Sequence, residues 1–513
     1  MNRALRLATM LLMVPLVLAG VLGHAQAPAG AWKPSVPRTW DEGALADWAT
    51  PLAGLNRRPV HMSAREYYAI PEENLQTYPV YMPGREPEGY WDRIQKTGPR
   101  PLVEPETLKT EADWIAAGER VFMDSVALRT FDPTLIAMAR DRKALEERRA
   151  GPLPDGTISS LRWLPTKDGM ALGFANCSAC HLLYLPDNTR VPGASSFAMP
   201  NSFRNALGGA IRTAERVLPG EAPFVMAGAS FGEWLYQAYG APWAKDPAGE
   251  QLKATTETAF AGFVGSNIRG GAVARWNGSI LYPAKIPDLI GFKDRKYIDH
   301  TATHLHRGIG DLMRYAALVS VAEATEFGEH RMLAPETKRF NTRLPDQSLY
   351  ALALYVYSLK PPANPNRLDA TAEAGGKVFQ REGCASCHTP PLYTSNKLTL
   401  AQGFTPPADA PASLDVLRIS VGTDPGLALR TRKGTGYYKV PSLKGVWYRG
   451  HYLHDGAAAS LEELFDPDRV KDTHVPGGWL PPGRKTQATS GHPFGLSLLP
   501  AERAQLVAFL KTL

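Results

Sequence analysis

The sequence predicts a mainly α-helical protein in which one design is repeated in two unequal halves. A five-residue cysteine motif occurs twice, at 177–181 and at 384–388. Before each motif lies a segment with the apolar spacing of an amphipathic helix, and each half closes on a further helical segment. Between these helices, short landmarks recur in the same order. Self-similar segments in a fixed order indicate an internal duplication.

The repeated motif reads Cys-x-x-Cys-His, the attachment signature of a c-type haem. In such a motif the two thiols bind the porphyrin covalently and the histidine becomes the proximal ligand of the iron. A zinc knuckle or a thioredoxin-like dithiol is the alternative, but each pair here carries its own histidine and the two motifs use all four cysteines. We therefore expect two covalent haem c groups in tandem c-type cytochrome domains. Their attachment residues are Cys177, Cys180, Cys384 and Cys387, and their proximal ligands are His181 and His388.

The landmarks of the repeat are short but ordered. Residues 117–122 and 374–379 share the pattern Ala-Gly-x-x-Val-Phe. Residues 285–291 match 439–445, and a histidine follows thirteen positions after the proline of each segment. These histidines are His300 and His454. The closing helices are expected at 344–360 and 499–511.

Four segments follow from this organisation. We expect a signal peptide at 1–25, an irregular proline-rich N-terminal arm at 26–105, a first haem domain at 106–362 and a second haem domain at 363–513. Pro361 and Pro362 mark the boundary between the two domains. Insertions at 123–176 and 183–278 enlarge the first domain. Such added loops are the natural place for substrate-shaping structure, although they also serve packing.

The first residues have the pattern of a secretory signal. Arg3 and Arg6 precede an apolar run at 7–23, and Gly23-His24-Ala25 fits a small-x-small cleavage site. We expect the mature protein in the periplasm or secreted; the alternative is an uncleaved membrane anchor. The net charge of +7 is scattered, with no block of Lys and Arg interleaved with aromatic residues. The sequence therefore predicts no nucleic-acid partner.

The distal ligands decide which iron is open. His492 lies in a Gly-His-Pro-Phe-Gly loop ahead of the last helix, where small c-type cytochromes carry their distal ligand. We predict His492 as the distal ligand of the second haem, with His474 as the runner-up and His454 third. The repeat register places Thr337 opposite His492, which predicts an open or weakly capped first haem. His330 and Met332 lie near but out of register. Three more histidines cluster beside the repeat and face either haem propionates or the domain cleft, or have a plain surface role: His300, His304 and His306.

The C-terminal part resembles the di-haem cytochrome c peroxidase superfamily. The residues that carry the resemblance are 439–443, 452–456 and 460–463, and it extends over about 111–513. It implies two c-type cytochrome domains with unequal haems, one transferring electrons and one doing chemistry. Many members also bind Ca²⁺, so calcium is an implied further cofactor.

Within the superfamily, the sequence looks closest to the rubber oxygenase branch. Bacterial peroxidases carry a Trp-Asp-Gly-Arg segment whose equivalent here, 297–300, lacks the tryptophan. Their distal glutamate has no match in register, and Glu323 and Glu326 are the nearest acids. Rubber oxygenases have an open N-terminal haem in an apolar pocket that holds dioxygen. Trp276 and Phe292 are the candidates for lining such a pocket, and Glu326 is the candidate acid of a peroxidase site.

The predicted function is a di-haem oxidoreductase that activates dioxygen or peroxide at the N-terminal haem, with a six-coordinate, electron-transferring C-terminal haem. A rubber-oxygenase-like dioxygenase is the first reading, a di-haem cytochrome c peroxidase the second, and a non-catalytic periplasmic electron carrier the third. The expected partners are O₂ or H₂O₂ together with an isoprenoid or an electron-donor protein. The sequence predicts no particular oligomeric state.

Overall fold

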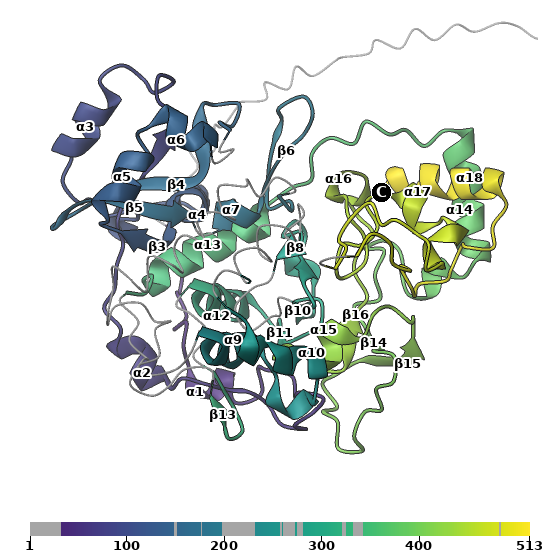
Figure 1. The fold of residues 1–513 in the computed structure, drawn as a ribbon. Coiled ribbons are helices and arrows are strands. Elements are labelled where there is room, and N and C mark those ends of the chain that lie inside the picture. The colour runs from purple at the N-terminus through teal and green to yellow at the C-terminus, as the bar shows by residue number, and fades with distance from the viewer. Residues whose placement is uncertain are drawn as a thin grey trace, which may run out of the picture.

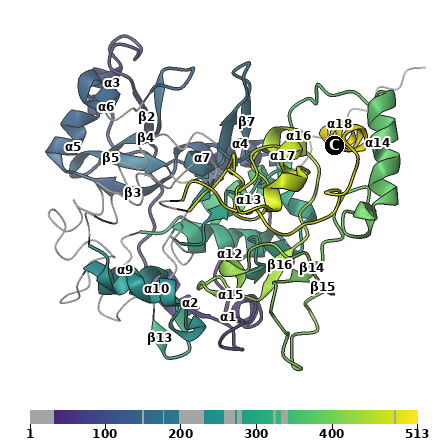
Figure 2. The same cartoon turned by 45° about the vertical axis from the view of Figure 1, so that its right-hand side comes forward.

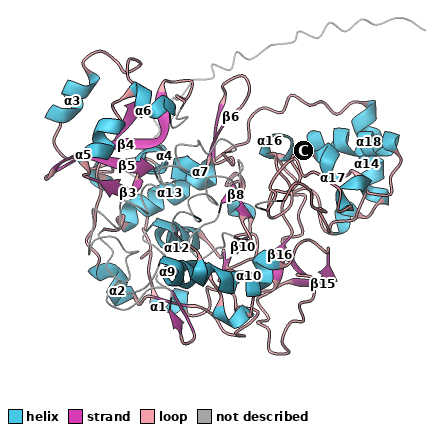
Figure 3. Cartoon of the chain, viewed as in Figure 1, coloured by secondary structure: helices cyan, strands magenta, loops and turns pink. Residues whose placement is uncertain are grey.

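The computed structural model describes residues 32–147, 151–175, 177–196, 231–256, 259, 272–273, 281–320, 325–331, 342–481 and 484–513. Helix makes up 35% of this part of the chain and strand 15%. The strands form several small sheets, which lie between and around the helices (Figure 3). The prediction of a mainly α chain therefore holds for the larger helices but leaves out a substantial β component.

Two helix pairs form the centres of the two halves. In the first half, α4 (Glu111–Asp124) packs on α13 (Asp346–Ser358), and in the second half α14 (Ala370–Arg381) packs on α18 (Pro500–Lys511). Figure 1 shows the second pair at the right of the molecule. Thr110 and Asp113 form a capping box at the start of α4, and the Asp369 side chain caps α14.

Both helix pairs cross at a glycine. A Cβ on Gly118 would lie 2.0 Å from the carbonyl oxygen of Ala351, and a Cβ on Gly375 would lie 1.9 Å from that of Gln505. No side chain fits at such distances, because heavy atoms in contact are normally at least about 3.5 Å apart. The glycines of the two Ala-Gly-x-x-Val-Phe segments thus let the helices approach each other closely.

A four-stranded antiparallel sheet lies beside the first pair. Its strands, in spatial order, are β2 (Tyr78–Tyr81), β4 (Thr157–Thr166), β5 (Gly169–Ala175) and β3 (Val126–Thr130). The insertion at 123–176 therefore supplies three strands and the N-terminal arm supplies the fourth. Pro79 lies within β2 and is compatible with the sheet because β2 is an edge strand. Three short helices flank this sheet: α3 (Tyr90–Lys96), α5 (Pro133–Met138) and α6 (Arg142–Glu147).

The N-terminal arm is more regular than predicted. It contains α1 (Glu42–Leu45), β1 (Val60–His61) and α2 (Ala64–Ala69), and β1 pairs with β12 (Thr325–Phe327) of the first domain. The fully buried Trp48 belongs to the core of the first half and donates from Nε1 to the carbonyl of Leu305. The correction has a physical reason: the partners of β1 and Trp48 lie more than two hundred residues further along the chain, beyond any local pattern.

The remaining elements connect these layers (Figure 2). In chain order they are η1 (Pro105–Thr107), α7 (Cys177–Cys180), β6 (Leu182–Tyr184), β7 (Arg190–Pro192), α9 (Phe231–Tyr239), η2 (Pro242–Ala244), α10 (Pro247–Glu250), η3 (Gln251–Ala254), β8 (Ala272–Val273), β9 (Ala284–Lys285), η4 (Phe292–Asp294), β10 (Tyr297–Ile298), β11 (His304–Leu305), α12 (Ile309–Ser320), β13 (His330–Arg331), η6 (Cys384–Ser386), β14 (Leu398–Leu400), β15 (Val416–Ser420), α15 (Gly426–Leu429), β16 (Tyr437–Lys439), α16 (Val446–Arg449), α17 (Leu461–Leu464) and η7 (Pro467–Val470).

Two reciprocal backbone hydrogen bonds join the halves. The N–H of Lys285 donates to the carbonyl of His454 at 2.7 Å, and the N–H of Lys439 donates to the carbonyl of His300 at 2.9 Å. Residues 361–369 run without helix or strand from α13 to α14. Among the helices that the structure describes, none has the length and apolar character needed to cross a membrane.

We predict that Gly375→Ala lowers the free energy of unfolding by about 2–3 kcal/mol, because the added methyl group would force α14 and α18 apart. Urea denaturation measures the change. Gly376→Ala is the matched control, since its Cβ would meet the Phe509 ring at 3.4 Å and alanine favours helix by up to about 1 kcal/mol. Equal unfolding midpoints for the two variants would contradict the prediction.

Candidate functional site

The second cysteine motif directly follows α14. Gly383, with φ of +72°, turns the chain from the helix into η6, which holds Cys384. The N–H of His388 donates to the carbonyl of Cys384 at 2.9 Å, so the motif closes as a single compact turn. Cys384 and Cys387 are half-buried, and burial raises the pKa of the Cys384 thiol to about 11. No disulfide joins the four cysteines in the structure.

The imidazole of His388 is oriented by backbone carbonyls. Its Nδ1 lies 3.1 Å from the carbonyl oxygen of Pro441 and 3.3 Å from that of Tyr393. With the proton on Nδ1, that nitrogen donates to the carbonyls and Nε2 is left as a lone-pair donor for a metal. Burial lowers the pKa of His388, which favours this neutral form.

His492 lies opposite His388. The two ring centroids are 6.5 Å apart and the ring planes are inclined by 54°. Burial, followed by the nearby His388, lowers the pKa of His492 to about 4, so this ring is also neutral at neutral pH. The structure thus brings the proximal and distal residues predicted for the second haem face to face.

The loop that carries His492 is held in an unusual backbone conformation. His492 has φ of +47° and Gly491 has φ of +80°, where a Cβ would lie 2.2 Å from the Thr423 nitrogen. The N–H of His492 donates to the carbonyl of Val421 at 2.6 Å. A non-glycine residue in the left-handed region persists only where the surroundings determine it.

Arg469 holds much of the backbone of this loop in place. Its side chain is fully buried, and Nη2 donates to the carbonyls of Gly491 and His492 at 2.8 and 2.9 Å. Nη1 donates to the carbonyl of Thr489, and Nε donates to that of Leu464 at 2.7 Å. A guanidinium can serve several acceptors because its donors form a fixed planar fork. The sequence analysis missed this residue, since an isolated arginine in a loop carries no motif.

The spacing of the two rings tests whether a haem fits. A metal–nitrogen bond is about 2 Å long, so an iron bound to Nε2 of both imidazoles requires ring centroids about 6 Å apart. The observed 6.5 Å agrees with that requirement. The cysteines, the oriented His388 and the opposed His492 therefore fit a covalent, bis-histidine haem.

The other two distal candidates lie in different surroundings. His474 places Nε2 3.0 Å from the Glu463 carboxylate, which also accepts the N–H of Gly477. His454 stacks against the Tyr438 ring at 4.4 Å and lies within hydrogen-bond distance of its hydroxyl. Only His492 of the three faces His388 among the described contacts.

The first cysteine motif forms α7. The N–H of His181 donates to the carbonyl of Cys177 at 3.0 Å, as the N–H of His388 donates to that of Cys384 in the second motif. The carbonyl of His181 accepts the N–H of Gly193 at 2.7 Å, and Ser196 donates to the carbonyl of Cys180 at 2.9 Å. These bonds fix the half-buried motif between the four-stranded sheet and the β6–β7 hairpin.

The candidates for the open haem are only partly described. Trp276, Glu323, Met332 and Thr337 lie outside the described residues. Phe292 is buried in the core of the first half, 4.9 Å from the His306 ring. Glu326 is half-buried in β12 opposite Val60, and His330 packs its ring against Trp243.

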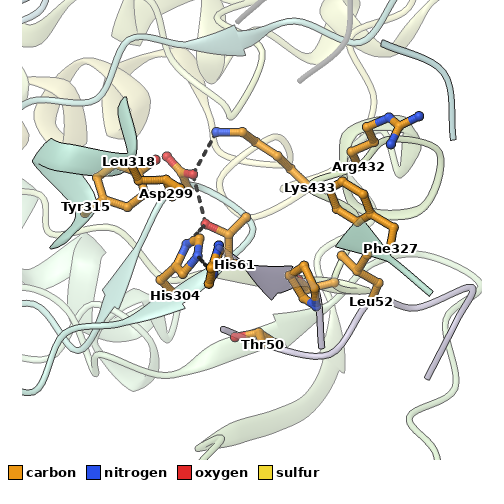
Figure 4. A pocket seen from close by; sticks show the side chains of 13 residues that line it. Thr50, Leu52, His61, Asp299, His304, Tyr315, Leu318, Phe327, Arg432 and Lys433 are labelled. Carbon is orange, nitrogen blue, oxygen red and sulfur yellow. Dashed lines mark hydrogen bonds and ion pairs between the residues drawn. The ribbon is translucent and has the colours of Figure 1, made fainter. Parts of the chain in front are cut away.

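A small cavity of about 30 Å³ lies where the arm meets residues 299–327 and residues 432–435 (Figure 4). It holds one or two waters at most. At its wall, Nε2 of His61 lies 3.1 Å from Nε2 of His304, so one ring donates to the other. Trp48 packs on His304 at 4.1 Å. Phe327 lines the cavity, and because side chains alternate along a strand, its neighbour Glu326 faces the other way.

Polar groups continue from this pair in a chain. Nδ1 of His304 lies 2.9 Å from the Thr303 hydroxyl, which donates to the Asp299 carboxylate at 2.9 Å. The Lys433 ammonium then binds the same carboxylate oxygen at 3.0 Å. In Figure 4 a dashed line joins the Lys433 ammonium to the Asp299 carboxylate, with His304 and His61 nearby. Burial lowers the pKa of His61 to about 4 and holds that of His304 well below its usual value. Both rings are therefore neutral.

The resemblance implies a Ca²⁺ site, but the described part of the chain contains no cluster of acidic side chains that could form one. No three His, Cys, Asp or Glu side chains gather there in a way that could hold a metal ion. Calcium therefore stays an expectation from the resemblance.

Comparison with known proteins gives two partial similarities, and no protein-family model matches the sequence. The chain is 29% identical over 152 residues to the methylamine utilization protein MauG of Methylorubrum extorquens, covering 28% of this chain and 35% of MauG. It is 28% identical over 164 residues to the cytochrome-c peroxidase IdrP1 of Denitromonas iodatirespirans, covering 28% of this chain and 41% of that protein. The chain thus spans less than half the length of each relative. Both support the resemblance to the di-haem cytochrome c peroxidase superfamily, and neither supports the rubber oxygenase branch.

Two solved structures show remote likeness. Hydrazine synthase of Kuenenia stuttgartiensis aligns at a TM-score of 0.29 and 14% identity, covering 55% of this chain and 86% of that chain. A MauG-like protein associated with microbial copper homeostasis aligns at a TM-score of 0.20 and 18% identity, covering 33% and 56%. Scores this low do not assign a shared fold.

Because His61 and His304 are neutral in the folded protein, we predict that the free energy of unfolding falls in acid. An unfolded histidine has a pKa near 6.5, so the stability that the folded state gains from keeping His61 neutral is complete above that pH and is lost as the pH falls toward 4. We expect the loss to reach about 3 kcal/mol. The measurement is the urea unfolding free energy between pH 7 and pH 4.5.

His61→Gln should reduce this pH dependence by the share that His61 contributes, because the substituted side chain takes up no proton on unfolding while His304 keeps its own lowered pKa. His330→Gln, at the Trp243 ring, controls for the loss of an imidazole in the same region. If the pH slopes of His61→Gln and the unaltered protein coincide, the pair is not the source of the acid sensitivity.

Proposed function

We propose that this protein is a di-haem c-type oxidoreductase that uses peroxide as its oxidant. The first haem, on His181, is the site of chemistry, and the second haem, between His388 and His492, is six-coordinate and transfers electrons. The facing imidazoles at 6.5 Å carry this proposal. A haem held by two protein ligands transfers electrons, while an open iron can bind an oxidant.

The two-domain design of the proposal is supported by equivalent contacts in the two halves. Gly118 meets Ala351 and Tyr355 as Gly375 meets Gln505 and Phe509. The reciprocal bonds of Lys285 and Lys439 join equivalent residues as well.

These contacts also define the register of the repeat. The pairs Ala351–Gln505 and Tyr355–Phe509 differ by one residue from a match of Leu344-Pro345 with Leu499-Pro500. The position equivalent to His492 therefore moves from Thr337 to Lys338. Both lie outside the described residues. Neither side chain is an imidazole or a thioether, so the expectation of an open or weakly capped first haem is kept.

Bound haem supplies the redox chemistry, and the chain supplies ligands, orientation and access. Cys384 and Cys387 tether the second porphyrin. The carbonyl of Pro441 orients His388, while Arg469 and the left-handed backbone at His492 fix the opposing ring. Because both imidazoles are neutral and buried, neither loses its lone pair to a proton at neutral pH.

Peroxide is favoured over dioxygen by the relatives, one of which is named a cytochrome-c peroxidase. The overall reaction would reduce one H₂O₂ to two H₂O with two electrons and two protons, the electrons coming from a donor protein. Glu326 remains the candidate acid, and Trp276 and Phe292 remain candidates for the pocket wall. We also propose export through the signal at 1–25, because c-type haem is attached outside the bacterial cytoplasm.

His492→Ala should convert the second haem from low-spin to high-spin, because one axial ligand is lost. The visible and electron paramagnetic resonance spectra report the change. Carbon monoxide should bind one haem in the unaltered reduced protein and two in the variant. His474→Ala is the control and should leave the spectrum unchanged, since His474 binds Glu463. An unchanged second haem in His492→Ala would remove His492 as the ligand.

The choice of oxidant is tested by two assays on the same holoprotein. We expect turnover of H₂O₂ with a reduced c-type cytochrome as electron donor, and no oxygen uptake with an unsaturated isoprenoid. Oxygen uptake with cleavage of the isoprenoid would instead establish the oxygenase function. If neither haem binds carbon monoxide, both irons are capped, and the protein is an electron carrier and not an oxidoreductase that binds peroxide.

A further inference from the structure

Four basic side chains gather where the two halves meet. They occupy two equivalent pairs of positions in the repeat: Lys285 and Lys439 begin the matching segments, and Arg295 and Arg449 lie ten residues after them. Lys285 is half-buried, as is Lys439, and each backbone N–H bonds the other half. The side chain of Arg449 is only 14% exposed. The cluster therefore lies in the joint between the halves rather than on an outer face.

Of the acids near the cluster in the described part of the chain, Asp288 is the one that forms an ion pair with a member. The buried Asp288 lies 3.3 Å from Nε of Arg449 and also accepts from the Tyr448 hydroxyl at 2.9 Å. Asp299 is engaged by Lys433 and Thr303. Further titratable neighbours of the cluster are Asp294, Asp455, His300, His306 and His454. Asp294 is exposed, so solvent screens its charge, and Asp455 is buried beside His454, where burial raises the pKa of its carboxyl.

The two lysines are the members of the cluster that have no polar partner among the described residues. Within the described residues, neither ammonium has a hydrogen-bond or ion-pair partner, and the ammonium of Lys285 lies over the Tyr452 ring, 5.8 Å from its centroid. Burial, followed by a neighbouring arginine, lowers the pKa of each lysine to about 7. Crowded cations without partners are costly, so the site is built for a bound anion.

The position of the cluster relates it to the proposed haem. Lys439 and Arg449 lie at the two ends of the segment whose Pro441 carbonyl lies 3.1 Å from Nδ1 of His388. The same segment accepts the Thr394 hydroxyl at its Val440 carbonyl, 2.7 Å away. This segment is therefore fixed against the proximal side of the second haem site.

We propose that Lys285, Lys439, Arg295 and Arg449 form a shared carboxylate site that binds haem propionates at the joint between the two halves. The inference rests on the proposed haem attachment and adds a ligand set to it. Propionates suit the site because each haem carries two carboxylates, and arginine and lysine bind carboxylates by charge-assisted hydrogen bonds. One cluster that neutralises propionates from both halves would connect the two haems electrostatically.

The experiment compares the haem-loaded variants Lys285→Met and Lys439→Met with Lys444→Met, an exposed lysine on the same segment. Resonance Raman spectra report the propionate bending mode, which responds to hydrogen bonds on the carboxylates. Spectroelectrochemistry reports the reduction potentials of the haems. We expect the bending mode to shift and the potential to fall in the first two variants, because removal of a nearby cation favours the ferric form. Lys444→Met should change neither quantity.

An unchanged bending mode in both lysine variants overturns the proposal, even if the potential falls, since a cation can act through space without binding a propionate. Lys285→Gln and Lys439→Gln repeat the test where a methionine variant does not fold. Inorganic phosphate is added to the unaltered protein in a parallel titration. A phosphate-dependent rise in melting temperature that the lysine variants lose would assign the site to a soluble anion instead.

Failure of the propionate site is distinguishable from failure of the proposed function. The pyridine haemochrome assay counts covalent haems, and the low-spin spectrum reports the axial ligand pair. Both are independent of the propionate band. Two covalent haems with an intact low-spin signal and an unshifted band would reject the cluster alone.

Discussion

The close crossing of α14 and α18 is the constraint on which the second site depends. Cys384 and His388 follow the end of α14, and His492 lies in the loop that leads into α18. The separation of the two imidazoles is therefore set by how closely these helices approach, and Gly375 sets that approach. A side chain there would displace one ring relative to the other. Arg469 then fixes the finer position of the His492 loop by binding its carbonyls.

Charge is distributed unevenly around this scaffold. The facing histidines are neutral because they are buried, and so are His61 and His304 at the arm. The joint between the halves instead concentrates cations beside a single well-placed carboxylate, Asp288. Such an arrangement is unfavourable without a counter-charge, and the anionic edges of two porphyrins are of the right chemical kind.

Local patterns predicted the parts of the molecule that depend on nearby residues. The Cys-x-x-Cys-His turns, the helix pairs and the His492 loop all follow from short segments whose chemistry is visible in the sequence. Long-range pairing was not predictable. The β2 strand of the arm joins β4, and His61 meets His304, across stretches that no periodicity connects. Pro79 fits in β2 because β2 is an edge strand, a position that the sequence alone does not reveal. The landmarks of the proposed repeat are visible in the sequence, but the register proposed from them changes by one residue when the packed glycines are compared.

The pairing of β1 with β12 has a consequence for how this chain acquires its structure. Val60 pairs with Glu326, and the indole of the buried Trp48 donates to the Leu305 carbonyl, so these two contacts form only when residues more than 250 positions further along the chain are present. Contacts this remote in sequence slow folding and leave apolar surface open to aggregation.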